Sequence, residues 1–397
     1  MNAPLKLAVP LLATLAFAAC NAGGTSNLPG SPGQSISQSH TVPDWQAKGL
    51  ATRACGDVPR GVARCDALIV NGGGKVGHDV AGWKPLDIQT RYHLPITQGS
   101  GQIVAIVDAY DNPNAATDIA AYRTEFGLGT ANFAKYNQNG QQSNYPSGNK
   151  NWGLEEDLDI EMVSAACPKC TIYLVEANGA DTNDLQTAEA QAVTLGAHVV
   201  SNSWGCPGSD ACVSSSYFST PGVVYLASAG DSGYSSGAQA PAALASVVAV
   251  GGTVLSLSGS TYSETTWNGS GAGCAAGVTK PSWQHDTGCS SRTENDIAAL
   301  AWQAAEYDTY GYGGWFTVGG TSVASPLLGG VFGLAGNASS LDAAKKFYTL
   351  KKKARHRSLN DITTGNNGSC GGSYLCTAGK GYDGPTGWGT PKGVKAF

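Results

Sequence analysis

Short runs of consecutive apolar residues alternate along this chain with stretches in which apolar positions recur at helical spacing. Runs this short and uniformly apolar fit strands that are buried on both faces, and the helical stretches between them supply the covering layers. The sequence therefore predicts an α/β protein with a mostly parallel sheet flanked by helices on both faces. The expected strands are residues 102–107, 171–175, 199–203, 223–227 and 247–250, and the expected helices between them are 115–126 and 185–195.

Polar residues follow several of these strands. Asp108, Ser203 and Asp231 each come at or just after the end of an apolar run. Binding sites of parallel sheets lie at the carboxyl ends of the strands. We therefore expect these residues to share one edge of the sheet with Ser322, which follows a further predicted strand.

The stretch around Ser322 has the pattern of a nucleophile. Residues 318–326 (Val-Gly-Gly-Thr-Ser-Val-Ala-Ser-Pro) follow an aromatic and β-branched strand at 314–318 and lead into an apolar helix at 327–334. Pro326 is expected in the first turn of that helix, where its missing N–H is tolerated. A hydroxyl beside the free N–H groups of a helix N-terminus suits the formation of an oxyanion. The alternative is an ordinary helix cap.

A predicted helix at residues 152–166 carries two pairs of acidic residues. Glu155 and Asp159 are one turn apart, so their carboxyl groups share a face, and Asp157 and Glu161 have the same spacing. A carboxyl pair can perform acid–base chemistry. The alternative is an acidic helix N-terminus that is stabilised by the helix dipole.

Two further patterns concern carboxylates in loops. Asp231 ends the sequence Ser-Ala-Gly-Asp and either shapes a turn or, when protonated, donates a hydrogen bond to an oxyanion as an amide does. In the tail, Asp361 and Asp383 occur among glycines. Two carboxylates with glycine carbonyls suit a hard cation, calcium first, although both residue types are also common in turns.

In this order the motifs resemble those of the sedolisin family, the serine-carboxyl peptidases with a subtilisin-like fold, from about residue 83 to residue 397. The resemblance implies a Ser/Glu/Asp triad and an acyl-enzyme intermediate, and it selects the first acidic pair over Asp157 and Glu161. It implies that the catalytic residues are Ser322 as nucleophile, Glu155 as general base, Asp159 as the group that orients it and Asp231 as oxyanion donor. It also implies one structural calcium ion held by the side chains of Asp361 and Asp383 and the carbonyls of Ile362, Gly379 and Gly381.

Two features depart from the family pattern. Only a short stretch up to residue 80 is available where family members usually carry a long folded propeptide. Asp108 is similar to the aspartate of true subtilisins, but none of the six histidines stands in the His-Gly-Thr motif which that triad requires.

The N-terminus has the features of an export signal. Lys6 precedes an apolar run that is too short to span a membrane and ends in small residues, so residues 1–20 are predicted to be a signal peptide. The sequence Phe-Ala-Ala-Cys also resembles a bacterial lipobox, which makes lipid anchoring through Cys20 the alternative to secretion. We expect a flexible tether and short pro-region at 21–80 and the peptidase domain at 81–397.

The cysteine content agrees with export. Eleven cysteines leave ten without Cys20, and neighbour pairing would give five disulfides in an oxidising compartment. With 13% charged residues and a net charge of −5, the chain is not expected to bind nucleic acid. The one basic run, 351–357, is expected to be the solvated end of a helix at 341–350.

These inferences combine into one hypothesis, an exported endopeptidase that cuts proteins or peptides at acidic pH. A carboxylate base with a pKa of about 4 and an aspartic acid that must stay neutral both favour an optimum well below pH 7. The alternatives are a tripeptidyl-peptidase and a non-catalytic exported binding protein with the peptidase fold. No transmembrane segment is expected, and a monomer is the working assumption.

Overall fold

The computed structural model describes residue 1 and residues 42–59, 61–72, 75–76, 79–207 and 212–397. Apart from Met1, the expected signal peptide, Cys20 and residues 21–41 of the expected tether and pro-region lie outside the described residues. The residues from 42 onward belong to one compact unit. No described helix has the length and apolar character needed to span a bilayer.

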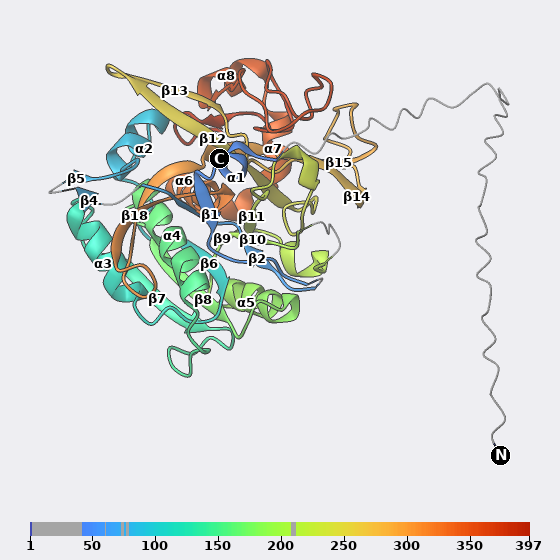
Figure 1. The fold of residues 1–397 in the computed structure, drawn as a ribbon. Coiled ribbons are helices and arrows are strands. Elements are labelled where there is room, and N and C mark those ends of the chain that lie inside the picture. The colour runs from blue at the N-terminus through green and yellow to red at the C-terminus, as the bar shows by residue number, and fades with distance from the viewer. Residues whose placement is uncertain (2–41, 60, 73–74, 77–78, 208–211) are drawn as a thin grey trace, which may run out of the picture. The chain divides into compact units, whose positions relative to one another are not determined.

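An eight-stranded sheet forms the centre of this unit and confirms the predicted α/β fold (Figure 1). All of its strand pairs are parallel except the pair at one edge, and each of the five predicted apolar runs forms one of its strands. In spatial order the strands are β13 (Thr261–Thr266), β12 (Val247–Ser258), β11 (Val224–Ser228), β9 (Val199–Asn202), β6 (Ile103–Ala109), β8 (Thr171–Ala177) and β7 (Asn132–Asn137), with β16 (Ile297–Leu300) also paired to β12.

Helices cover both faces of the sheet. On one face α6 (Thr321–Ala335) brings Gly329 against Val104 of β6, and α4 (Lys150–Ala166) packs beside α6. The adjacent Ile103 points to the other face, because side chains alternate along a strand, and there it lies near the end of α5 (Thr182–Thr194). A Cβ at Gly330 would lie 2.7 Å from the Cβ of Ala166, so this glycine lets α6 approach α4 closely. α3 (Ala115–Glu125) packs on the outer side of α4.

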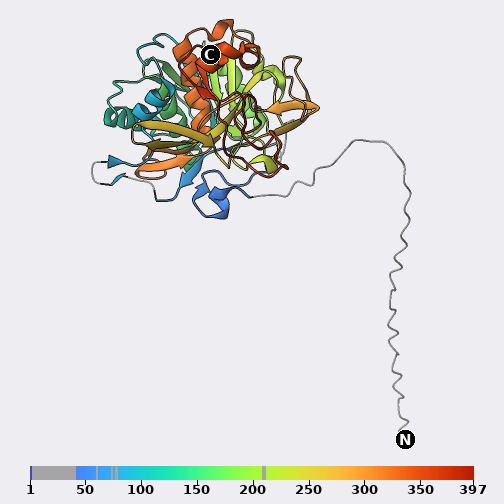
Figure 2. The same cartoon turned by 90° about the horizontal axis from the view of Figure 1, so that it is seen from above.

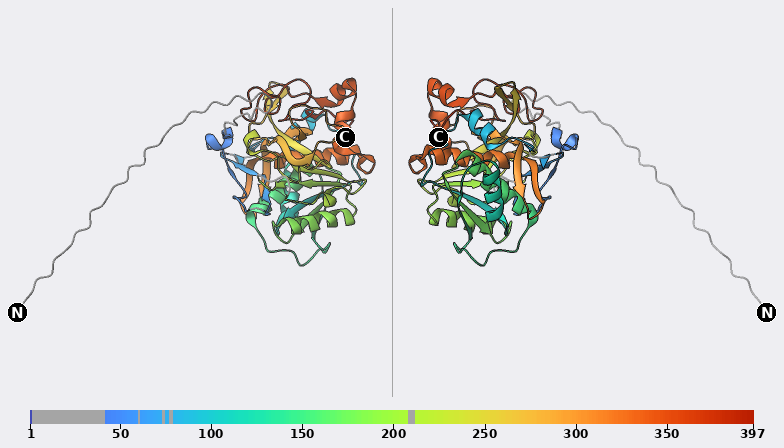
Figure 3. Two further views of the ribbon diagram at one scale, coloured as in Figure 1. Left: turned by 90° about the vertical axis from the view of Figure 1, so that its right-hand side faces the viewer. Right: turned by 90° about the vertical axis from the view of Figure 1, so that its left-hand side faces the viewer.

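A second, antiparallel sheet lies beside the start of α6. It contains β1 (Ala51–Arg53), β3 (Leu68–Val70), β18 (Gly314–Gly319) and β17 (Trp302–Asp308), in that order. Figures 2 and 3 show the blue N-terminal strands against the orange ones. The strand predicted before Ser322 is therefore confirmed as β18, but our expectation that it ends at the edge of the parallel sheet is wrong. An apolar run does not reveal which distant strand it pairs with.

Two helix predictions need correction. α6 begins at Thr321, so Pro326 lies in its second turn instead of the first, and the carbonyl of Ser322 lacks the usual N–H partner four residues on. The basic run does not continue the preceding helix. α7 (Ala343–Thr349) ends before Leu350 and Lys351, whose backbones are extended, and the basic residues form a separate helix, α8 (Lys352–Ser358).

Five disulfides confirm the predicted neighbour pairing, and each joins cysteines only 3 to 15 residues apart. They are Cys55–Cys65, Cys167–Cys170, Cys206–Cys212, Cys274–Cys289 and Cys370–Cys376. The remaining helices and strands are short: α1 (Asp44–Ala47), β2 (Arg64–Cys65), β4 (Lys75–Val76), β5 (Asp79–Val80), α2 (Pro85–Tyr92), β10 (Trp204–Gly205), η1 (Ser215–Phe218), η2 (Tyr234–Ser236), β14 (Gly273–Thr279), β15 (Ser291–Glu294), η3 (Ala338–Ser340), β19 (Leu359–Asn360) and β20 (Thr390–Pro391).

Candidate active site

Ser322 lies buried in the first turn of α6. The cap residue of this helix is Gly320, so the alternative that Ser322 is the helix cap is wrong. Its Oγ donates to the carbonyl oxygen of Ser203 at 3.3 Å. Gly320 has a φ of +116°, and a Cβ there would lie 2.8 Å from Oδ2 of Asp231, so only glycine fits this turn. The turn thereby brings Ser322 close to Asp231.

Glu155 and Asp159 lie on α4, and both are fully buried. The Ser322 hydroxyl is near enough to Glu155 to lower the pKa of its carboxyl, although neither Glu155 oxygen has an aligned hydrogen-bond partner among the described residues. Asp159 Oδ1 accepts a 2.6 Å hydrogen bond from Ser203 Oγ. Ser203 thus joins the two sides of the site, since its hydroxyl holds Asp159 and its carbonyl accepts from Ser322.

The two carboxyls favour the protonated state. Burial first, and then the neighbouring carboxyls of Asp159 and Asp108, raise the pKa of Glu155 well above its usual value. Burial also raises the pKa of Asp159 well above its usual value, and the Ser203 hydrogen bond opposes this only in part. Both shifts run opposite to the expectation of a carboxyl base with an ordinary pKa near 4.

Asp108 is a third carboxyl at this site. It lies near the end of β6, fully buried, and neither oxygen has a hydrogen-bond partner among the described residues. Burial and then the charges of Asp159 and Glu176 raise the pKa of Asp108 well above its usual value. Its position at the end of the first strand is the signal in the sequence, but without a histidine partner the sequence does not predict it as a catalytic residue.

Asp231 follows β11 and faces the first residue of α6. Its Oδ1 accepts from the N–H of Thr321 at 2.8 Å and from the Thr321 hydroxyl at 3.1 Å, whereas its buried Oδ2 has no partner among the described residues. Burial and then the nearby Asp66 raise the pKa of Asp231 to about 8, although Arg53 and Thr321 lower it in part. The side chain is therefore a neutral acid at and below neutral pH, with one oxygen available to donate a hydrogen bond.

The second acidic pair of α4 faces elsewhere. Asp157 Oδ2 accepts from Asn112 at 2.7 Å, and Glu161 Oε2 accepts from the N–H of Tyr307 at 3.1 Å. Asp157 also forms a buried cluster with Asp118 and Asp308, whose carboxylate oxygens lie within 4.8 Å of one another and could hold a cation. Nothing in the sequence placed these three aspartates together, because they come from separate elements.

The predicted calcium residues come together in the tail. Both Asp361 oxygens accept from the N–H of Gly381, at 3.2 and 3.1 Å, and Asp383 Oδ2 accepts from the N–H of Gly379 at 2.9 Å. Ile362 is buried directly after Asp361. Burial above all, and to a smaller extent Asp361, raises the pKa of Asp383 to about 7. No lysine or arginine forms an ion pair with either aspartate within the described part of the chain. The residues present therefore fit a bound cation.

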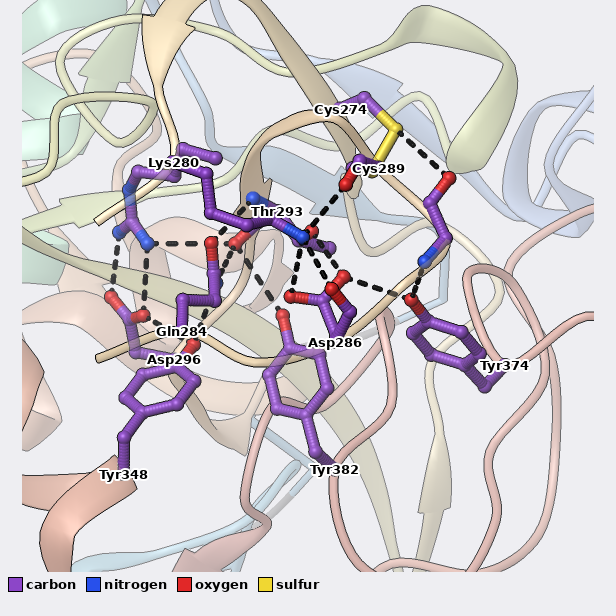
Figure 4. Close-up of polar contacts among 12 residues, drawn as sticks. Cys274, Lys280, Gln284, Asp286, Cys289, Thr293, Asp296, Tyr348, Tyr374 and Tyr382 are labelled. Carbon is purple, nitrogen blue, oxygen red and sulfur yellow. Dashed lines mark hydrogen bonds and ion pairs between the residues drawn. A yellow bond between two sulfur atoms is a disulfide. The ribbon is translucent and has the colours of Figure 1, made fainter. Parts of the chain in front are cut away.

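A dense polar network lies beside this loop, but its groups are mutually satisfied (Figure 4). Lys280 Nζ pairs with Asp286 at 3.1 Å, Asp286 also accepts from Tyr374 at 2.8 Å, and the buried Arg292 pairs with Asp296 at 2.7 Å. The network joins the β14–β15 hairpin to the tail. We interpret it as structural because its acids already have cationic or hydroxyl partners.

Comparison with known proteins gives one family model and several relatives. Residues 100–373 match the model of the subtilase family, Peptidase_S8. Kumamolisin from Bacillus sp. (strain MN-32) is 30% identical over 359 residues, in an alignment that covers 79% of this chain and 62% of kumamolisin. Sedolisin from Pseudomonas sp. (strain 101) is 30% identical over 315 residues, in an alignment that covers 69% of this chain and 53% of sedolisin. The chain thus spans less than two thirds of either relative.

Two solved structures have folds similar to that of this chain. Pseudomonas sedolisin, a serine-carboxyl proteinase complexed with two molecules of pseudo-iodotyrostatin, superposes with a TM-score of 0.69 at 27% identity, covering 79% of this chain and 96% of that one. Sphericase superposes with a TM-score of 0.52 at 20% identity, covering 78% of this chain and 97% of that one, which supports the fold alone.

Proposed function

Because the chain belongs to the subtilase family and, within it, to the sedolisins, we propose that it is an exported serine-carboxyl endopeptidase that hydrolyses proteins at acidic pH. One observation carries the proposal: the Ser322 hydroxyl, the Glu155–Asp159 pair and the buried Asp231 carboxyl converge at the start of α6. Five disulfides support an extracellular location.

In the proposed reaction Ser322 Oγ attacks the peptide carbonyl while Glu155 accepts its proton and later returns it to the leaving amine. Asp159, held by Ser203, keeps Glu155 oriented. Asp231 donates its proton as a hydrogen bond to the oxyanion that forms. Water then hydrolyses the acyl-enzyme by the same groups.

The raised pKa of Asp231 supports a working range at and below neutral pH. Asp231 must stay neutral to donate, so activity should fall as the pH rises through about 8. Glu155 must lose its proton to act as base. The decline of activity at low pH should therefore depend on the pKa values of Glu155 and Asp159, which titrate together as a pair. Opening the site to water would lower the pKa of Glu155, because burial is the largest cause of its elevation.

The tail loop is the proposed calcium site. Asp361 and Asp383 would supply carboxylate oxygens and Ile362, Gly379 and Gly381 carbonyl oxygens, a ligand set that suits calcium. When bound, the ion would neutralise two carboxyls and stabilise the fold around the tail.

The test is hydrolysis of unfolded casein between pH 3 and 7 by the wild type, with Ser322→Ala and Glu155→Gln as matched variants. We expect activity that is lost almost completely in both. An inactive wild type that is folded, calcium-loaded and freed of its N-terminal stretch would overturn the proposal and favour the binding-protein alternative.

A further inference from the structure

The N-terminal stretch crosses the candidate active site. We call residues 61–70 the crossing segment. Its β2 runs antiparallel to β10, with Arg64 opposite Gly205, and the N–H of Asp66 donates to the carbonyl of Ser203 at 3.0 Å. On the other flank the N–H of Ala63 donates to the carbonyl of Ala180 at 2.8 Å.

Beyond Asp66 the crossing segment changes partners. Its β3 runs antiparallel to β18, with Leu68 opposite Gly319. The segment is therefore paired with the chain on both sides of Ser322, first through β10 and then through β18. An extended peptide recognised by strand addition would bind in this way.

The Asp66 carbonyl lies at the nucleophile. The Ser203 carbonyl that accepts from Asp66 also accepts from Ser322 Oγ. A Cβ on Gly320 would lie 2.0 Å from the Asp66 carbonyl oxygen and 2.8 Å from Asp231 Oδ2, so the backbone of Asp66 approaches this glycine closely, on the side that faces Asp231. The peptide bond presented to Ser322 is thus Asp66–Ala67.

The Asp66 side chain enters a polar pocket. It is fully buried, and its Oδ2 accepts from Ser228 Oγ at 2.8 Å and from the Gln239 side-chain amide. Arg64 and Arg53 lie near enough to oppose the effect of burial on its ionisation. The two donors, Ser228 and Gln239, belong to the pocket and suit a short acidic side chain rather than a lysine. The two arginines belong to the N-terminal stretch itself, so they add to this only in the uncut chain.

We infer that the crossing segment blocks the substrate groove of this chain, that Ser322 cleaves the Asp66–Ala67 bond, and that the groove prefers aspartate before the cut bond. This inference rests on the proposed function. Ser322 Oγ bonds to the Asp66 carbonyl carbon, the bond to Ala67 nitrogen breaks, and Ala67 leaves as a free amine with the proton taken from Ser322. Water then releases Asp66 as a carboxylic acid and restores Ser322.

The first experiment follows the chain itself. Wild type and Ser322→Ala are incubated at pH 4 and examined by intact mass and N-terminal sequencing, with casein hydrolysis measured in parallel. We expect a product that begins at Ala67 in the wild type only, and casein hydrolysis with a lag that tracks its appearance. Asp66→Lys should abolish this cut, whereas Asp44→Lys, at an exposed aspartate of the same stretch that pairs with Lys48, should leave it intact.

The second experiment tests the pocket separately from folding of the variants. A peptide with the sequence of residues 62–70, carrying serine for Cys65, is given to the activated enzyme. Replacing its aspartate by lysine should lower kcat/KM about 100-fold, because the pocket donors lose their acceptor. Gln239→Leu should reduce this preference.

The outcomes separate the two proposals. Casein hydrolysis without a lag by a chain that is uncut or cut elsewhere, or equal turnover of both peptides, would overturn this inference and leave the proposed function standing. Loss of both casein hydrolysis and self-cleavage in folded protein would overturn both.

Discussion

The buried Glu189 of α5 provides a quantitative test of the structure that does not depend on activity. One of its oxygens accepts a 3.5 Å hydrogen bond from Asn202 and the other has no partner among the described residues. Burial raises the pKa of Glu189 from 4.5 to about 8. Ionising it in the folded state therefore costs about 5 kcal/mol more than in the unfolded chain.

The sign of the pH dependence of stability follows from the raised pKa of Glu189. Between pH 4.5 and 8 the folded state holds a proton on Glu189 that the unfolded state has lost, so stability falls as the pH rises. The contribution is fully present below pH 4.5 and is lost at a rate of about 1.4 kcal/mol per pH unit up to about pH 8. Glu189→Gln keeps the shape of the side chain and removes the proton exchange.

The assay is urea unfolding from pH 4 to 8 in a Ser322→Ala background, which prevents self-digestion. We expect the Glu189→Gln chain to lose stability less steeply with pH, by about 1.4 kcal/mol per unit within that window. Asp342→Asn, which removes one exposed negative charge, is the control and should leave the slope unchanged. Parallel pH curves for Glu189→Gln and its background would refute the reasoning.

Three further predictions concern the active site and the tail. Asp231→Ala should lower kcat about 10²–10³-fold, whereas Asp231→Asn should keep a donor above pH 8, so its pH profile should lack the alkaline decline; normal turnover by the alanine variant would contradict the oxyanion role. Ser203→Ala removes a hydrogen bond that lowers the pKa of Asp159, so we expect the decline of kcat/KM at low pH to move to higher pH. An unchanged pH profile would count against a linked titration of Asp159 and Glu155. Chelation should lower Tm and calcium should restore it, while Asp383→Ala should not respond; an identical Tm in excess chelator would argue against the tail site.

Much of the parallel sheet followed from the sequence because its strands are short and wholly apolar. Each expected run became a strand of the parallel sheet, whereas the strand before Ser322 belongs to the second sheet. The disulfides were also predictable, since each pair is close along the chain and needs only local geometry. The approach of Glu155 and Asp159 to Ser322 depends on the close packing of α4 and α6 at Gly330, and in the sequence only the resemblance to the sedolisin family indicated it.

What the sequence did not reveal depends on contacts between distant segments. β3 pairs with β18 about 250 residues away, and neither strand carries a pattern that specifies the other. For the same reason the position of Asp66 at Ser322 was not predictable, and neither was the cluster of Asp118, Asp157 and Asp308. The raised pKa of Glu155 depends on burial and on Asp108, which come from the folded arrangement.

The short span of every disulfide has a consequence for activation. Cys55 and Cys65 both precede Asp66, and the other four bridges lie wholly after residue 166. No covalent link would thus join the two pieces after a cut at Asp66–Ala67. Before the cut the crossing segment is tethered and competes with substrate at a high effective concentration. After the cut, its part up to Asp66 is a separate ligand that dilution removes. The protein concentration, and not only the cleavage, should then set how much enzyme is free.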